Sequence, residues 1–183
     1  MPPSTLLNIV DVEATCWENQ PPHGQLNEII EIGLTVVDIG HRRRLSKNRV
    51  LVQPQQSTVS QFCTKLTGLT QEQVAQGVTF EEACRTLKAE WGTDVVPWAS
   101  WGNYDRNQFT RQCDRAEVNY PFTTEHTNAK RTFAASHELP REVGMATALN
   151  IAGLSLEGRH HRGDDDSWNI AALVLHLVER GDW

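Results

Sequence analysis

The first third of the chain has three runs of apolar and β-branched residues, each short enough to be a strand. They cover residues 6–15, 28–38 and 44–53. Gly40 separates the second run from the third, as is typical of a tight connection between neighbouring strands. The pattern therefore predicts an antiparallel meander at the start of the fold.

After about residue 60 the apolar positions recur at helical spacing. Thr79 and Glu82 form the sequence pattern of a capping box, Asn103 is placed to cap the next helix, and Asp164 or Asp165 to cap the last. The predicted helices cover residues 60–66, 70–76, 79–91, 104–117, 129–137, 141–152 and 164–179. A strand is expected over 95–101, and a loop with a short edge strand over 119–127. Strands followed by alternating helices and strands predict an α/β domain with a mixed sheet.

Composition supports one globular domain that covers residues 1–183. Hydrophobic residues make up 39% of the chain and charged residues 22%. No signal peptide or membrane-length apolar stretch is evident, so we expect a soluble, cytoplasmic protein with no membrane association. The four cysteines lack any Cys-x-x-Cys spacing, which indicates reduced thiols rather than a zinc knuckle or redox pair.

The formal net charge of −6 argues against broad, sequence-blind binding of phosphates. It does not exclude a nucleic-acid enzyme, because clustered carboxylates that bind cations add to the negative count. Basic segments occur locally at 41–44 and 159–162. The first is explained most simply as a solvated turn.

The first predicted strand carries two acids, Asp11 and Glu13, on one face, while Val10 and Val12 point to the other. Two ionised carboxylates side by side repel each other, and a hard divalent cation with oxygen ligands would offset that repulsion. A metal site is one interpretation of the pair. The alternative is two solvated acids at a strand end.

Two helices each place an acid of the first turn on the apolar stripe. Asp105 aligns with Phe109 and Cys113, and Asp166 aligns with Ile170, Leu173 and Leu177. Either acid alone could simply be stabilised by the helix dipole. Four inward carboxylates, however, need two divalent cations or protonation, because partly buried unpaired ions are costly.

His161 precedes Asp166 by five residues on a glycine-containing loop, which predicts an imidazole above the acids. A neutral histidine there can act as a general base near pH 7. The alternatives are an exposed loop histidine, or a zinc site that uses both His160 and His161. The zinc site is disfavoured because adjacent side chains are expected to diverge and the nearby donors are hard carboxylate oxygens.

Together, Asp11-x-Glu13, Asp105 and His161 five residues before Asp166 resemble the DEDDh class of 3′→5′ exonucleases. Further segments are similar to the ERI-1/histone-mRNA exonuclease branch and to KapD-like bacterial proteins: 11–16, 27–33, 66–70, 100–102 and 165–171. The fold that this resemblance implies is ribonuclease H-like, a mixed five-stranded sheet flanked by helices. Asp164, which makes three consecutive acids, departs from the branch pattern.

The resemblance implies hydrolysis assisted by two Mg²⁺ ions, for which Mn²⁺ would substitute. Asp11 would bridge both ions, Glu13 and Asp166 would hold one, and Asp105 would support the other. His161 would take the proton of the attacking water. Nucleoside 5′-monophosphates would leave one at a time from the 3′ end.

By the same resemblance, the substrate is single-stranded nucleic acid, RNA rather than DNA, with no obligate protein partner evident. The expected nucleotide-binding residues are Ala14, Thr15 and Cys16 at the terminal sugar, Leu66 and Thr67 at the last base, and Trp101, which is either a stacking or a core residue. Two alternatives stay open. One is a DNA-directed proofreading or trimming exonuclease, and the other is a metal-dependent RNA-binding module without turnover.

Overall fold

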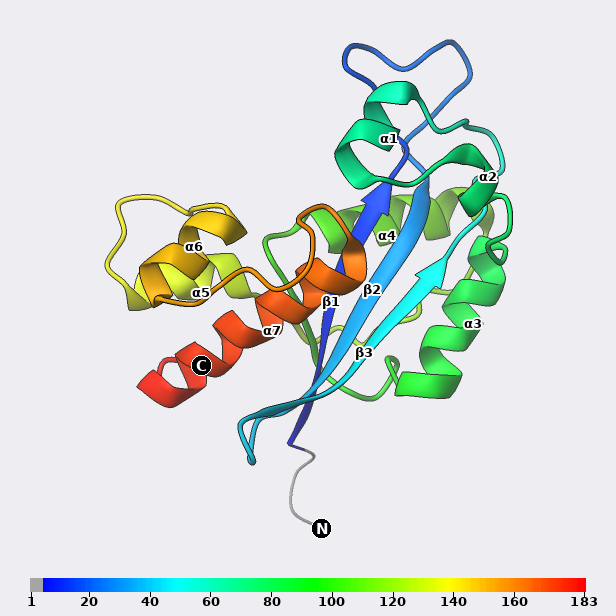
Figure 1. The fold of residues 1–183 in the computed structure, drawn as a ribbon. Helices are drawn as coiled ribbons and strands as arrows, with labels where there is room; N and C mark the ends of the chain where they lie inside the picture. Colours follow the sequence, from blue (N-terminus) through cyan, green and yellow to red (C-terminus); the bar gives the residue numbers. More distant parts are fainter. Residues whose placement is uncertain (1–4) are drawn as a thin grey trace.

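The computed structural model describes residues 5–183 and has a five-stranded sheet at its centre (Figure 1). Strands β1 (Leu6–Ala14), β2 (Ile29–Asp38) and β3 (Arg43–Leu51) form an antiparallel meander. Strands β4 (Trp98–Ser100) and β5 (His126–Asn128) extend the sheet in parallel beyond β1. The order is β3-β2-β1-β4-β5. The sheet is therefore mixed, and the predicted fold class is confirmed.

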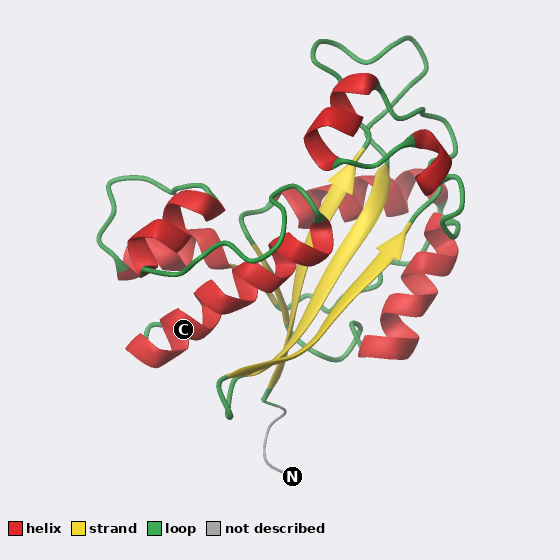
Figure 2. Ribbon diagram, viewed as in Figure 1, coloured by secondary structure: helices red, strands yellow, loops and turns green. Residues whose placement is uncertain are grey.

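Helices cover both faces of the sheet (Figure 2). One layer packs α7 with α5 and α6 against Leu7 and Ile9, and the other packs α3 and α4 against Val10 and Val12. Short helices α1 and α2 lie beyond the carboxyl end of β1. The bounds are α1 Gln61–Thr67, α2 Gln71–Val74, α3 Phe80–Trp91, α4 Tyr104–Ala116, α5 Ala129–Ser136, α6 Met145–Ala152 and α7 Gly163–Arg180.

Several helix boundaries follow the predicted caps. Ser60 and Thr70 accept hydrogen bonds from the first turns of α1 and α2, and Thr79 forms the predicted capping box with Glu82. Helix α1 ends at Gly68, whose φ of 75° lies in the left-handed region that glycine adopts without strain.

Asn103 is the N-cap residue of α4, as predicted, although its side chain makes no cap hydrogen bond. Three other boundary predictions were wrong. The strand expected over 95–101 covers only β4, and the helix expected from residue 141 begins at Met145. Asp164 and Asp165 lie inside the first turn of α7, whose N-cap residue is Arg162. Asp164 and Asp165 mislead because they satisfy the cap preference while their favourable interaction with the helix dipole suits the first turn equally well.

The start of α7 lies directly on the sheet because two glycines meet there. A Cβ at Gly33 of β2 would overlap the carbonyl oxygen of Gly163, and a Cβ at Gly163 would lie 2.9 Å from the Gly33 nitrogen. Asp11 is the register partner of Gly33 on β1. The missing side chains therefore let the first turn of α7 approach the end of β1.

All four cysteines are free, and three of them are buried, as expected. Within residues 5–183, no helix combines the length and the apolar character that a membrane crossing requires. The expected single domain includes residues 1–4, which lie outside the described part of the chain.

Candidate active site

Strand β1 brings Asp11 and Glu13 to the α7 face of the sheet, as predicted. Leu7 and Ile9 precede them on the same face and pack in the core under α7. The end of the strand therefore replaces core residues with carboxylates where it emerges from beneath the helix. Glu13 is only 8% exposed.

Asp166 reaches the same point from the first turn of α7. Its side chain is buried, and Oδ2 accepts a hydrogen bond from the backbone nitrogen of His161 at 2.9 Å. Glu31 of β2 accepts another from the Gly163 nitrogen at 2.7 Å and thereby holds the start of the helix. Asp166 is thus fixed by its own loop and by the neighbouring strand.

Asp105 approaches from the first turn of α4, in the other layer. It is buried, and Oδ1 accepts a hydrogen bond from the backbone nitrogen of Val12 at 2.9 Å. That bond ties α4 to the strand residue between Asp11 and Glu13. All four predicted acids line one pocket of about 370 Å³.

Ligand oxygens of Asp11, Glu13 and Asp166 all lie within 4.8 Å of one another. Among residues 5–183, no lysine or arginine forms an ion pair with any of the three, nor with Asp105. The cluster is therefore a set of oxygen donors suited to a hard divalent cation.

Burial and the lack of a lysine or arginine partner in the described chain raise the pKa values of the clustered carboxylates. Burial, followed by the charges of Asp105, Glu13 and Asp166, holds the pKa of Asp11 well above its ordinary value. Burial and the charge of Asp166 raise the pKa of Glu13 to about 8. Burial raises the pKa of Asp105 to about 6 against the opposing hydrogen bond from Val12. The carboxylates cannot all ionise at neutral pH without free-energy cost unless a cation joins them.

His161 lies on the loop that leads into α7 and lines the pocket, with φ of 64°. Its ring stacks on His160, with centroids 4.0 Å apart, and His160 Nδ1 lies 3.0 Å from Asp166 Oδ2. The expectation that adjacent histidines diverge was wrong, because the left-handed backbone turns both rings to the same side. Burial lowers the pKa of His161, which favours the neutral imidazole.

The predicted nucleotide-binding residues separate into two groups. Ala14, Cys16, Leu66 and Trp101 line the pocket. Trp101 also donates from Nε1 to the Val143 carbonyl at 3.1 Å and packs on a buried phenylalanine, as expected of a core residue.

Thr15 and Thr67 do not line the pocket. Both are fully buried and hydrogen-bonded to the backbone: Thr15 Oγ1 donates to Leu26 O at 2.8 Å, and Thr67 Oγ1 donates to Cys63 O at 2.9 Å. Their hydroxyls hold the segments that carry Cys16 and Leu66.

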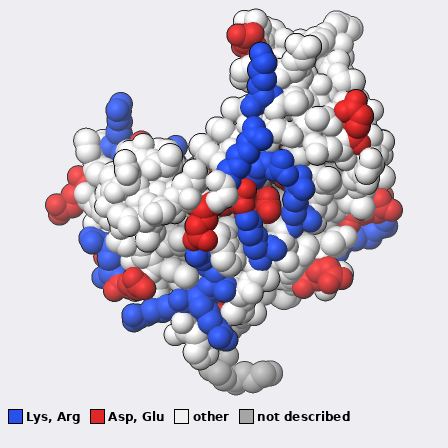
Figure 3. Space-filling model, in the orientation of Figure 1, with Lys and Arg blue, Asp and Glu red and all other residues white. Residues whose placement is uncertain are grey.

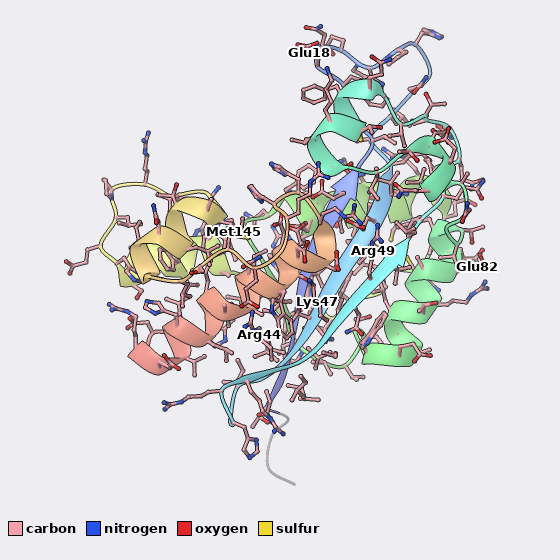
Figure 4. All side chains as sticks on the ribbon, in the orientation of Figure 1. Glu18, Arg44, Lys47, Arg49, Glu82 and Met145 are labelled. Atoms are coloured by element: carbon pink, nitrogen blue, oxygen red, sulfur yellow. The ribbon has the colours of Figure 1, made fainter. Side chains whose placement is uncertain are left out.

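Other pocket residues were not predicted to belong to the site. Tyr104, Gly144 and Met145 carried no recognisable signal in the sequence, and Val12, His160 and Ile170 complete the lining. Met145, labelled in Figure 4, begins α6, so the pocket wall includes a segment that sequence spacing did not connect to the acids. Only the Asp166 contact of His160 could have been inferred, from its place beside His161.

The fold and the acid cluster agree with a comparison against known families. The profile of RNase_T, described as "Exonuclease", matches residues 9–174. The chain belongs to this exonuclease family. The predicted family resemblance is therefore confirmed.

Several curated relatives of this exonuclease-family chain are named 3′-5′ exonucleases or exoribonucleases. Human "3'-5' exoribonuclease 1" is 30% identical over 94% of this chain and 52% of its own length. The fruit-fly "3'-5' exonuclease Snipper" is 29% identical over 99% of this chain and 72% of its own. The chain thus spans about half the length of the human relative.

A solved structure extends the similarity to three dimensions. The nuclease domain of 3'hExo, described as a DEDDh family member bound to rAMP, superimposes with a TM-score of 0.87 at 28% identity, over 98% of this chain and 94% of that one. A full-length 3'-exonuclease gives a TM-score of 0.86 over 97% of this chain. The ribonuclease H-like exonuclease fold is therefore confirmed for this family member.

Proposed function

We propose that this chain is a metal-dependent 3′→5′ exonuclease that releases nucleoside 5′-monophosphates from single-stranded RNA. The observation that carries the proposal is the convergence of Asp11, Glu13 and Asp166 within 4.8 Å without a lysine or arginine partner in the described chain. Such a cluster fits divalent cations. The name of the human relative, an exoribonuclease, supports the RNA preference.

Asp11, Glu13 and Asp166, with Asp105 behind them, would hold two Mg²⁺ ions, or Mn²⁺ in their place. Bound there, the ions would supply positive charge to the scissile phosphate and the departing 3′ oxygen. The protein contributes rigidity: Asp105 is fixed by Val12, and Asp166 by the backbone of His161. The donor set would therefore be nearly preformed before a cation binds.

The remaining pocket residues would orient the 3′-terminal nucleotide. Ala14 and Cys16 lie where the strand ends and would contact the sugar, while Leu66 and Trp101 would enclose the base. An apolar wall opposite the acids suits a base that is splayed out of a stack, so an unpaired 3′ end is the expected substrate.

His161 would accept the proton of the attacking water, since its imidazole lines the pocket beside Asp166. We expect His161→Ala to slow hydrolysis about 10²- to 10⁴-fold, the usual contribution of a general base. Single-turnover rates on saturating RNA would measure this loss. A wild-type rate in the variant would remove the assignment, and His160→Ala serves as the matched comparison on the same loop.

Incubation of 5′-labelled single-stranded RNA with Mg²⁺ or with EDTA tests the activity. We expect a descending ladder that requires the metal, with 5′-monophosphates as products. Full-length RNA that stays intact yet is bound equally well in EDTA would instead identify a binding module. Rates on DNA of the same sequence test the RNA preference, and a faster rate on DNA would replace RNA with DNA in the proposal.

A further inference from the structure

Figure 3 shows a column of basic side chains on one face of this acidic protein. Contacts in this region connect basic residues of three distant segments, three from β3, two from the loop before α7 and one from α1: Arg44, Lys47, Arg49, Arg159, Arg162 and Lys65. Strand β3 has an irregular register in which Arg44 pairs with Val37 and Ser46 with Val36, so Leu45 is extra. This bulge shifts the alternation, and Arg44 therefore faces α7 together with Lys47 and Arg49.

The three β3 residues lie one after another along the strand (Figure 4), and each has a partner. Arg44 pairs with Glu157 at 2.7 Å and stacks over a tryptophan of α7, Lys47 pairs with Asp165, and Arg49 pairs with Glu31. These ion pairs connect α7 and the loop before it to β3 and β2. This part of the column has a structural explanation.

Lys65 and Arg159 differ from the rest of the column. Both are exposed, and within residues 5–183 neither forms an ion pair with a carboxylate. Arg159 lies against Gly68, and its Nη2 is 3.5 Å from the Lys65 carbonyl oxygen, a weak contact that leaves the other guanidinium donors free. Two residues whose cations lack a carboxylate partner in the described chain are therefore in contact where α1 meets the α7 loop.

The positions of Lys65 and Arg159 relative to the pocket indicate which part of a substrate they would contact. Leu66 and His160, the chain neighbours of Lys65 and Arg159, line the pocket, whereas the two cations themselves lie outside that lining. A group held by them would thus be close to the terminal nucleotide but beyond it. In a nucleic-acid strand, the group at that position is a backbone phosphate on the 5′ side of the scissile bond.

We propose that Lys65 and Arg159 bind a backbone phosphate of the substrate strand as it leaves the active-site pocket. The proposal rests on the proposed nuclease function. Guanidinium binds phosphate through paired N–H donors, and an ammonium adds a point charge beside it. Each of the column's other cations has a carboxylate partner, with Arg162 lying 3.9 Å from the same Glu31 that pairs with Arg49. Lys65 and Arg159 therefore give an acidic protein a local binding site for a polyanion.

Two substrates of different length test this binding. One is a single-stranded 20-mer RNA, and the other is the p-nitrophenyl ester of a nucleoside 5′-monophosphate, which has no upstream phosphate. The variants are Lys65→Gln, Arg159→Gln and their double, with Arg85→Gln/Lys88→Gln on α3 as a control of equal charge change. Kinetics over a range of salt concentrations are measured for the wild type and each variant.

We expect the double variant to have a KM for the 20-mer about tenfold higher than the wild type, with kcat nearly unchanged. Its kinetic constants on the ester should match those of the wild type. The salt dependence of log(kcat/KM) should become shallower by about 0.7 for each phosphate that the variant no longer neutralises. Arg159→Lys, which keeps the charge, should retain most of the wild-type slope. The α3 control should behave as the wild type does.

Three results would decide against the phosphate site or against its premise. Wild-type KM and salt slope on the 20-mer, with the ester hydrolysed normally, would overturn the phosphate site and leave the nuclease function intact. Equal losses on both substrates would show that the residues only hold α1 in place, which also overturns it. A wild-type protein that hydrolyses neither substrate would remove the proposed function itself.

Discussion

Glu13 and Glu31 are direct partners across β1 and β2, on the same face of the sheet, and both are buried. Glu31 is satisfied by the protein itself: Arg49 forms an ion pair with it, and Gly163 donates a backbone hydrogen bond at 2.7 Å. Glu13 has no such partner in the described chain and faces two further acids instead. Neighbouring positions in one register thus hold an acid with protein partners and an acid without them.

This difference distinguishes a structural acid, Glu31, from an acid suited to bind a cation, Glu13. A carboxylate that is fully paired stabilises its surroundings, whereas an unpaired cluster costs stability until a cation arrives. Glu31 uses its bonds to hold the first turn of α7, and that turn carries Asp166. The structural acid Glu31 therefore positions Asp166, which contacts His160 and the His161 nitrogen but has no lysine or arginine partner in the described chain.

Substitution of Asp11 is the strongest test of the carboxylate cluster. Asp11→Asn should lower kcat/KM for RNA on the order of 10³-fold or more, because a charged ligand in the centre of the cluster is lost. The metal-free variant should nevertheless be at least as stable as the metal-free wild type, since burial and the charges of four acids oppose ionisation of Asp11. Urea unfolding in EDTA and single-turnover kinetics in Mg²⁺ measure the two effects. Reduced stability without metal would contradict this account.

Substitution of Glu31 should have the opposite effect on stability. Glu31→Gln removes the buried negative charge that accepts from the partly exposed Arg49 and from the Gly163 nitrogen, and should destabilise the protein by about 1.5–3 kcal/mol, the usual contribution of hydrogen bonds to a charged group. Unfolding with and without Mg²⁺ is the measurement, and the loss should persist in both. Arg85→Gln, which breaks the exposed pair with Glu81, is the matched control and should cost less than about 1 kcal/mol. Equal losses in the two variants would refute a structural role.

The unpaired cluster should also give the metal-free protein a distinctive pH dependence. The pKa of Glu13 is raised from 4.5 to about 8, so its contribution is fully present below pH 4.5 and is lost as pH rises through 8. Stability in EDTA should therefore fall across that window, and less so in Glu13→Gln. Mg²⁺ should restore about 2.7 kcal/mol at pH 8 when free metal is 100 times its dissociation constant. Equal pH profiles for wild type and variant in EDTA would argue against the raised pKa.

The four acids of the pocket were easier to predict from the sequence than the structural acid Glu31, for a physical reason. Strand alternation and helix periodicity are local, and they suffice to place Asp11 and Glu13 together and to turn Asp105 and Asp166 inward. Glu31 lies in an apolar run, and its partners come from β3 and from α7, more than 130 residues later for Gly163. A long-range pair leaves no periodic signal in the chain.

The same limit applies to the loop before α7. The stacking of His160 on His161 depends on a left-handed backbone at a non-glycine residue, and the alignment of Arg44 with Lys47 depends on an extra residue in β3. Neither irregularity is specified by composition or spacing. Strand and helix identities were therefore predictable, whereas the contacts that join the layers required coordinates.

The close approach of Gly33 and Gly163 provides a further test of this comparison, because it brings the start of α7 close to Glu13 and Glu31. Gly33→Ala should destabilise the protein by about 1–3 kcal/mol, since the added methyl group would overlap the Gly163 carbonyl oxygen and push the helix start away. Asp166 would move with that turn, so kcat/KM for RNA should fall even at temperatures where the variant remains folded. Gly144→Ala is the control for stability, because a Cβ there meets nothing within 4 Å. If Gly33→Ala kept wild-type activity and stability, the close packing of α7 against Gly33 would not be what positions Asp166.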